Sequence, residues 1–254
     1  MKIITQNHHV VDATQSWKYE MRRKAQVIQP FLYLGPSAAT RDLDFMRAEG
    51  ITMLLVIRNT MTAQASLLSG DKVASTLGIQ AAAVDVAGNP ELIAAFPRAC
   101  KIINDHLIAV YRQSLINNSM NPESPIRSGK VLVFCESGNE RSAAVAAAYL
   151  MTVYGLDTVS AIQYVQSQRF CVAYDDPLKH LLLTYENLLD AQRSVLEATP
   201  PTSLVFGEGA QAKPKRRRED TSEDDAAMCL DDQDDEERFA NRSGFVPFRD
   251  TSTQ

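Results

Sequence analysis

Short apolar runs recur along the first part of the chain and end at polar or glycine-containing stretches. The run "ITMLLVI" (51–57) is apolar at nearly every position and has the length of a strand buried on both faces. Similar runs lie within "AQVIQPFLYLG" (25–35), "LGIQAAAVDVAG" (77–88) and "VLVF" (131–134). These patterns predict the strands of a small, buried sheet.

Apolar residues at helical spacing follow these runs. Residues 89–111 place one at every third or fourth position, and Pro90 suits the first turn, where its missing N–H costs nothing. The next stretch, 112–130, is polar and predicts a long surface loop.

Three further helices are predicted after the last strand. An alanine-rich helix covers about residues 142–154 and ends at Gly155 as its C-cap. A second covers 157–169 with Asp157 as its N-cap, and a third covers 175–198. Strands that alternate with helices and then give way to helices alone predict an α/β sandwich, with a small, mostly parallel central sheet flanked by helices.

Charge divides the 254-residue chain into a neutral part and a polarised tail. Residues 1–212 hold 18 Lys and Arg against 19 Asp and Glu. "KPKRRR" (213–218) holds five basic residues and no acid, and residues 219–237 hold eleven acids and no base. Blocks of like charge repel themselves and bury little surface. We therefore expect a flexible N-terminus (1–16), one folded domain (17–198) and a disordered C-terminal tail (199–254).

Several classes of protein are disfavoured. No stretch reaches the roughly 18 apolar residues of a membrane span, and the first residues lack the apolar core of a signal peptide. We expect no metal or other cofactor, because the cysteines and histidines have no ligand-like spacing. These residues are Cys100, Cys135, Cys171, Cys229, His8, His9, His106 and His180.

The candidate chemistry lies between the last predicted strand and the alanine-rich helix. Cys135 and Arg141 are separated by five residues, Gly138 lies between them, and Ser142 follows at once. In a strand-loop-helix setting, the backbone N–H groups of such a loop and the helix N-terminus can surround one tetrahedral anion. Arg141 can bind two phosphate oxygens, Cys135 can attack the phosphorus as a thiolate, and Ser142 can donate to that sulfur.

This segment resembles the active-site loop of the dual-specificity protein phosphatases. More closely, the chain resembles the serine/threonine/tyrosine-interacting pseudophosphatases, the STYX type, over roughly residues 17–190. The resemblance implies the fold of these phosphatases and a phosphate-binding loop made of Cys135, Glu136, Ser137, Gly138, Asn139, Glu140 and Arg141. The matching stretches are "WKYEMRR" (17–23), "IQPFLYLGP" (28–36), "GITMLLVIR" (50–58), "NPELIAAFP" (89–97), "GKVLVFCESGNERSAA" (129–144) and "YVQSQRFC" (164–171).

The sequence departs from the catalytic members at two positions. They place a histidine before the cysteine, where this chain has Phe134, and a general-acid aspartate at the position that "NP" aligns with Gly88. Loss of general acid catalysis typically costs about 10²–10⁴-fold in rate. STYX-type pseudophosphatases, in turn, have glycine in place of the nucleophile, whereas this chain keeps Cys135.

Three acids near the predicted loop each allow two interpretations. Asp85 is either structural or a substitute general acid from a shifted position. Separately, Arg58 at the end of the strand 51–58 is expected to be a structural ion-pair partner. Glu136 and Glu140 should point outward, where they either read basic residues around a phosphosite or are simply solvated. Screening by solvent should keep their cost to anion binding at about 1 kcal/mol or less.

Two functions follow from these features. The favoured one is a STYX-like module that binds phosphotyrosine or phosphothreonine of signalling proteins with little or no turnover; the resemblance implies phosphorylated kinases, including MAP kinases, as partners. The alternative is a slow cysteine-dependent protein phosphatase. A third, weaker reading makes Cys135 an oxidisable sensor thiol.

The tail bears on localisation. The basic block, Lys213, Lys215, Arg216, Arg217 and Arg218, predicts a nuclear localisation signal and an import receptor as partner, against the alternative of a solvated basic patch. The resemblance likewise implies a nuclear and cytoplasmic protein. Nucleic-acid binding is disfavoured because the adjacent acids would repel phosphate, and membrane binding is not expected.

Overall fold

A computed structural model describes residues 17–64, 68–121 and 125–198. The expectations for residues 1–16 and 199–254, including the localisation signal at 213–218, lie outside these described residues. The domain bounds of 17–198 stay a prediction.

A five-stranded sheet forms the centre of the domain. Its strand order is β1 (Gln26–Gln29), β2 (Leu32–Pro36), β5 (Val131–Cys135), β3 (Met53–Asn59) and β4 (Gln80–Val86). Only the edge pair β1–β2 is antiparallel; the other three pairs are parallel. The mostly parallel sheet predicted from the apolar runs is therefore confirmed.

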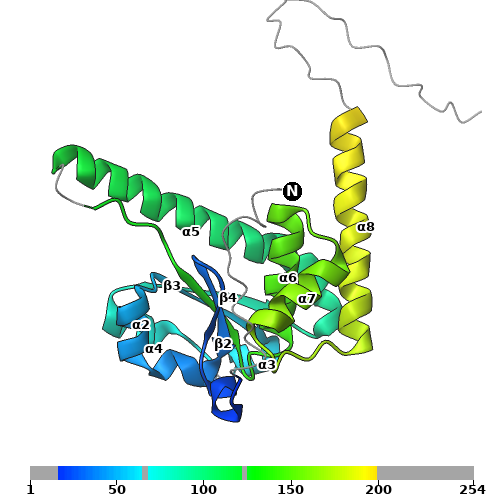
Figure 1. Cartoon of the computed structure of the whole chain (residues 1–254), viewed down its shortest axis with the longest axis horizontal. Coiled ribbons are helices and arrows are strands. Elements are labelled where there is room, and N and C mark those ends of the chain that lie inside the picture. The colour runs from blue at the N-terminus through cyan, green and yellow to red at the C-terminus, as the bar shows by residue number, and fades with distance from the viewer. Residues whose placement is uncertain (1–16, 65–67, 122–124, 199–254) are drawn as a thin grey trace, which may run out of the picture. The chain divides into compact units, whose positions relative to one another are not determined.

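Helices cover both faces of this sheet (Figure 1). One face carries α5 (Leu92–Met120), α6 (Arg141–Tyr154) and α7 (Thr158–Gln168), against which α8 (Asp176–Ala198) packs. The other face carries α2 (Leu43–Glu49) and α4 (Asp71–Leu77). The remaining short elements are η1 (Tyr19–Arg23), η2 (Ser37–Arg41), α3 (Thr60–Gln64) and η3 (Asn89–Glu91).

The strand period of two divides the apolar residues between two cores. In β5, Val131 and Val133 pack with α5–α8, whereas Leu132 and Phe134 pack with α2 and α4. Adjacent residues of one strand thus point to opposite faces of the sheet. The same alternation decides on which face Phe134 and Cys135 lie.

Both predicted helix ends near the last strand are confirmed. Gly155 is the C-cap of α6 in the left-handed conformation, with φ of 67°, and its N–H donates to Met151 O at 3.1 Å. Asp157 caps α7, where its carboxylate accepts from Ser160 N at 2.8 Å. Local side-chain chemistry was sufficient to place these ends.

The prediction of a surface loop at 112–130 is wrong in its first half. Helix α5 continues to Met120, because its polar residues make helix-compatible hydrogen bonds. Gln113 donates to Asn117 at 3.1 Å, and Ser119 Oγ donates to Leu115 O at 2.9 Å. Polar composition marked an exposed helix here, not an irregular loop.

Two kinds of feature are missing from residues 17–64, 68–121 and 125–198. No helix there is both long enough and apolar enough to cross a membrane. No three His, Cys, Asp or Glu side chains there come close enough to share a metal ion.

Candidate phosphate-binding site

The Cys-x5-Arg loop joins β5 to α6 at the carboxyl edge of the parallel strands. Cys135 is the last residue of β5, and Arg141 is the first residue of α6. Gly138 is buried, whereas Glu136 and Glu140 are exposed, as expected for side chains that point away from the loop centre. The seven predicted loop residues thus connect the end of β5 to the start of α6, and Ser142 follows in the first turn of that helix.

Two hydrogen bonds hold the Cys135 sulfur. Its side chain is buried, with 2% of the residue exposed. Ser142 Oγ donates to Sγ at 3.1 Å, and the Gly138 N–H donates to it at 3.2 Å. The sulfur is thus positioned as an acceptor at the base of the loop, as a thiolate nucleophile would be.

Gly138 is required by its conformation and by its surroundings. Its φ of +73° lies in the left-handed region that disfavours side chains. A Cβ there would also lie 2.4 Å from the carbonyl carbon of Gly35, at the end of β2. On the same side, the backbone N–H and the hydroxyl of Ser37 both donate to Glu136 O at 3.3 Å. The loop is therefore packed tightly onto the end of β2.

Arg141 carries a donor that nothing in the described chain satisfies. Its Nε is buried and has no hydrogen-bond partner among residues 17–64, 68–121 and 125–198. Buried donors without a partner are rare, and each needs an explanation. An anion in the loop would supply the acceptor, which fits the bidentate grip that Arg provides for phosphate.

Arg169, just after α7, holds the loop in place by hydrogen bonds. The sequence alone assigned no role to this residue. Its guanidinium is completely buried. Nε donates to Gly138 O at 3.0 Å, and Nη2 donates to Ser137 O at 3.3 Å and to Asn139 Oδ1 at 3.1 Å. Each of these bonds fixes one residue of the loop, so Arg169 is a positioning residue of the site.

The same guanidinium ties the loop to the N-terminal segment. Nη2 donates to Arg22 O at 2.8 Å, and Nη1 donates to Lys24 O at 2.8 Å and also to Gln26 Oε1. Burial lowers the pKa of Arg169 from its usual value. Four of the six acceptors are backbone carbonyl oxygens and two are side-chain amide oxygens, which suits a delocalised guanidinium with five N–H donors. The only sequence signal for Arg169 was its place within "YVQSQRFC".

Cys171 and the chain after it complete this support. Cys171 Sγ donates to Asn139 Oδ1 at 3.3 Å, and the Ala173 N–H donates to Asn139 O at 3.2 Å. Burial raises the pKa of the Cys171 thiol, while the positive charges of Arg169 and Arg22 act in the opposite direction. The loop is thus held on one side by β2 and on the other by residues 169–173.

Phe134 belongs to the core and not to the loop. It is 1% exposed and packs in the cluster that includes Leu54 and Leu68, on the α2–α4 face. At Gly70, an added Cβ would lie 3.5 Å from the Phe134 ring, so the ring fills the space beneath that turn. A phenyl ring has no donor or acceptor, so it contributes packing and cannot hydrogen-bond the loop.

Asp85 is paired with Arg58, the residue directly opposite it on β3. Arg58 Nε donates to Asp85 Oδ1 at 2.7 Å, and Arg58 Nη1 donates to Leu68 O at 2.6 Å. Arg58 is therefore the structural ion-pair partner that was expected. Since Val84 and Val86 face the α5–α8 core, strand alternation directs Asp85 to the other face. A role for Asp85 as substitute acid stays a prediction.

Gly88 lies in the turn between β4 and η3. Its φ of −166° and ψ of 176° are extended, so this backbone accepts any residue. A Cβ there would meet only Pro90 Cδ, at an ordinary 3.6 Å. Ala87, beside it, is held by Asn59, whose amide donates to Ala87 O at 2.9 Å, and by Glu91, which accepts from Ala87 N at 2.8 Å. Position 88 of this turn therefore has room for an acidic side chain, and the sequence places none there.

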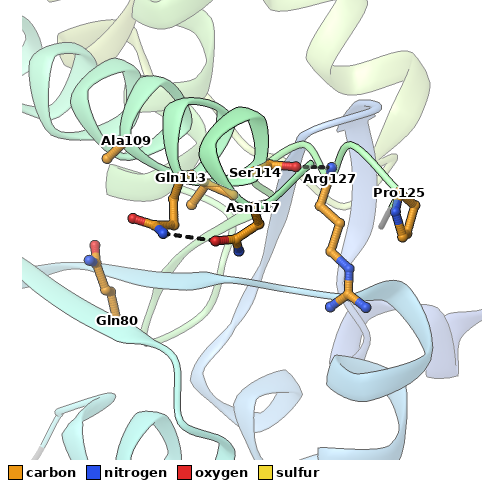
Figure 2. A pocket seen from close by; sticks show the side chains of 8 residues that line it. Gln80, Ala109, Gln113, Ser114, Asn117, Pro125 and Arg127 are labelled. Atoms are coloured by element: carbon orange, nitrogen blue, oxygen red, sulfur yellow. Dashed lines mark hydrogen bonds between the residues drawn. The ribbon is translucent and has the colours of Figure 1, made fainter. Parts of the chain in front are cut away.

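A separate cavity of about 550 Å³ lies beside the second half of α5. Figure 2 shows Ser114 in this cavity, where its hydroxyl accepts from Arg127 N at 2.6 Å. The described lining contains no carboxylate, thiol or imidazole, so it offers no general acid and no base that could activate the Ser114 hydroxyl. It consists of Gln80, Ala109, Val110, Gln113, Ser114, Asn117, Pro125 and Arg127.

The chain is similar in sequence to dual specificity phosphatases and to serine/threonine/tyrosine-interacting proteins. Residues 116–188 match the model of the dual specificity phosphatase catalytic domain. The serine/threonine/tyrosine-interacting protein of Mus musculus is 31% identical over 212 residues, covering 81% of this chain and 85% of that protein. Dual specificity phosphatase 28 of Homo sapiens is 41% identical over 91 residues, covering 35% of this chain and 49% of that protein. The crystal structure of the human tyrosine phosphatase-like serine/threonine/tyrosine-interacting protein has 29% identity and a TM-score of 0.47, covering 65% of this chain and 97% of that one.

Proposed function

Because the chain belongs to the serine/threonine/tyrosine-interacting protein family within the dual-specificity phosphatases, we propose that it binds phosphorylated side chains of other proteins in the Cys135–Arg141 loop with little or no turnover. The observation that carries this proposal is the buried Arg141 Nε, which has no acceptor among the described residues. Around it, the loop is fixed by Gly138 on one side and by Arg169 on the other. A loop held in this way needs little rearrangement to bind a phosphate.

Low turnover follows from the groups around the loop. Phe134 cannot hydrogen-bond the loop, and Gly88 provides no proton for a leaving oxygen. Asp85 and Glu91 each lie three residues from Gly88, and both are engaged. Arg58 Nε donates to Asp85 Oδ1 at 2.7 Å, and the Ala87 N–H donates to Glu91 Oε2 at 2.8 Å. Phosphotyrosine and phosphothreonine have poor leaving groups, so the absence of an acid weighs heavily on their hydrolysis.

A second candidate, slow cysteine-dependent phosphatase activity, is favoured by the geometry at Cys135. Ser142 Oγ and the Gly138 N–H both donate to its sulfur, which is the arrangement expected around a nucleophilic thiolate. A leaving group that needs no proton would bypass the missing acid. The two candidates therefore differ in whether bound phosphate reacts, not in whether it binds.

The test combines binding and turnover in the full chain. A phosphotyrosine peptide should bind, and Arg141→Ala should weaken that binding at least about tenfold, because charge-assisted hydrogen bonds contribute about 1.5–3 kcal/mol. Hydrolysis of a small aryl phosphate between pH 5 and 8 should be the same in the unmodified chain and in Cys135→Ser. Turnover that disappears in Cys135→Ser would establish the phosphatase instead, and absence of peptide binding would overturn the proposal.

The partners that fit this proposal are phosphorylated signalling proteins, among them kinases such as MAP kinases. Action in nucleus and cytoplasm would depend on Lys213, Lys215, Arg216, Arg217 and Arg218, which lie outside the described residues. A fluorescent fusion without residues 213–218 should lose nuclear accumulation; undiminished accumulation would refute the import signal.

A further inference from the structure

A positively charged surface lies directly beside the phosphate-binding loop. It is made by η1 with its flanking residues and by Phe170, and we call it the N-terminal surface. Its cations are all exposed, and they lie within seven consecutive residues. The members of this surface are Trp17, Lys18, Tyr19, Arg22, Arg23, Lys24 and Phe170.

The buried guanidinium of Arg169 fixes the distance between this surface and the loop. One nitrogen, Nη2, donates to Arg22 O at 2.8 Å and to Ser137 O at 3.3 Å. Two oxygens that accept from the same nitrogen lie within about 6 Å of each other. These oxygens place the backbone of Arg22 next to the loop. Burial raises the pKa of Cys171, whose Sγ donates to Asn139 Oδ1 in the loop at 3.3 Å, and the charge of Arg22 opposes that rise, so this cation acts on groups beside the loop.

The cations of the surface are not neutralised by the described protein. Among residues 17–64, 68–121 and 125–198, Lys18, Arg22, Arg23 and Lys24 form no ion pair, and Glu20 is the one acid between them. The Arg22 guanidinium instead lies over the Tyr19 ring at 4.0 Å. Stacking of this kind holds an arginine in place while its donors stay open to a ligand.

Aromatic side chains frame these cations. Tyr19 and Phe170 are 66% and 59% exposed, although large aromatic residues usually bury most of their area. Trp17 packs against Phe170 with ring centroids 6.2 Å apart. Cations beside exposed aromatic rings and next to a specific pocket are the composition of a protein recognition surface.

We propose that the N-terminal surface is a specificity subsite that selects acidic side chains within about three residues of the phosphorylated residue. An extended peptide advances about 3.3 Å per residue, so its near neighbours reach from the loop to Arg22 and Arg23. The inference rests on the proposed function and names the class of phosphoprotein that the site takes. The ligand is a phosphopeptide with an acidic flank.

An anionic membrane would fit the same cations less well. Glu136 and Glu140 are exposed on the neighbouring loop and Glu20 on η1 itself. A flat anionic surface would meet these carboxylates together with the cations, whereas a peptide can place its acids on the N-terminal surface alone. Charge complementarity therefore favours a peptide.

The experiment measures binding of labelled phosphotyrosine peptides to the full chain by fluorescence anisotropy. One peptide carries two Glu within three residues on the N-terminal side of the phosphotyrosine, and a second carries them on the C-terminal side. Matched peptides carry Gln or Lys at those positions. The test variant is Arg22→Gln with Arg23→Gln, which leaves the Arg22 carbonyl in place for Arg169. The control variant, Arg112→Gln with Arg127→Gln, removes the same charge beyond the amino edge of the sheet.

Of the two Glu peptides, we expect the one whose acids face the N-terminal surface to bind the unmodified chain about fivefold more tightly than its Gln counterpart. The reason is that one exposed ion pair raises the binding constant by up to about a factor of five. This preference should vanish in the test variant, persist in the control variant and shrink as salt is raised. Equal affinity for Glu and Gln peptides, or a preference for Lys, would overturn the inference while leaving the proposed function standing. Failure of every phosphopeptide to bind would overturn both. Loss of phosphatidylserine-vesicle binding in the test variant, without any peptide preference, would identify a membrane surface instead.

Discussion

Two segments reach the same edge of the sheet after parallel strands, and they differ in what they retain. The 135–141 loop after β5 keeps a buried thiol that accepts from two donors and an arginine whose Nε has no acceptor among the described residues. The 86–91 turn after β4 keeps its shape, held by Asn59 and Glu91, but presents glycine at position 88. The first segment has the groups that phosphate binding needs, whereas position 88 of the second has no acidic side chain.

This difference separates binding from catalysis in physical terms. Anion binding needs N–H groups and a guanidinium in fixed places, and the loop supplies them. Hydrolysis also needs a proton delivered to the leaving oxygen, which only an acidic side chain of the right reach can provide. A phosphatase fold can therefore lose one property and keep the other.

The largest expected effect comes from Arg169, on which the loop depends. Replacing it by Gln should lower the free energy of unfolding by about 3–5 kcal/mol, because buried carbonyls of the loop and of residues 22–24 lose their donors. Urea unfolding measures this. The control is Arg193→Gln, whose partner Asp190 lies at 2.8 Å in an exposed pair worth about 0.5 kcal/mol. An equal loss of unfolding free energy in both variants would show that Arg169 does not hold the loop in place.

The two glycines of the comparison should respond differently to alanine. Gly138→Ala should cost about 2–4 kcal/mol and abolish phosphate binding, since a positive φ and a clash with Gly35 act together. Gly88→Ala should change stability by less than about 0.5 kcal/mol, because its backbone is extended and its surroundings are open. Thermal unfolding and phosphopeptide titration check both. Intact binding in Gly138→Ala would contradict the close packing of the loop.

Gly88→Asp should reduce the difference between the two segments. An acid at this position should raise hydrolysis of a phosphate ester with a poor leaving group by about tenfold, a part of the roughly 10²–10⁴-fold that a well-placed general acid contributes. The rate should fall as pH rises and the carboxyl group loses its proton. Gly88→Asn keeps the shape without the acid and should remain at the original rate. An equal rate in both variants would mean that the turn does not reach the leaving oxygen.

The smallest effect is expected at the opposite edge of the sheet, where His106 lies between Thr52 and Gln80. Its ring nitrogens are 2.7 Å from Thr52 Oγ1 and 2.8 Å from Gln80 Oε1. Burial lowers the pKa of His106, so the unfolded chain binds a proton more readily. Stability from this neutral imidazole is present above about pH 6.5 and is lost as pH falls through the lowered value. His106→Gln should flatten this part of the pH dependence of Tm; an unchanged slope would assign it to other groups.

Local patterns in the sequence were sufficient for the strands, for the caps at Gly155 and Asp157, and for the loop from Cys135 to Ser142. Each of these depends on residues that are neighbours along the chain: alternation within a strand, a cap within one turn, or five residues between a thiol and a guanidinium. The resemblance also identified Phe134 and Gly88 as the two positions where the chain lacks the histidine and the aspartate of catalytic members. The polar half of α5 was not predicted as a helix, because composition alone does not distinguish an exposed helix from a loop.

Only the tertiary structure decided what surrounds the loop. Arg169 meets Gly138 across 31 positions of sequence and Arg22 across 147, and Asp85 meets Arg58 across 27. Such contacts depend on strand order and on which face a side chain takes, and neither is encoded in a short stretch of residues. The sequence by itself determined the strand, the Cys-x5-Arg loop and the helix that follows it. The packing of distant segments decided what holds the loop in place, that Asp85 is paired with Arg58 and which cations lie beside the loop.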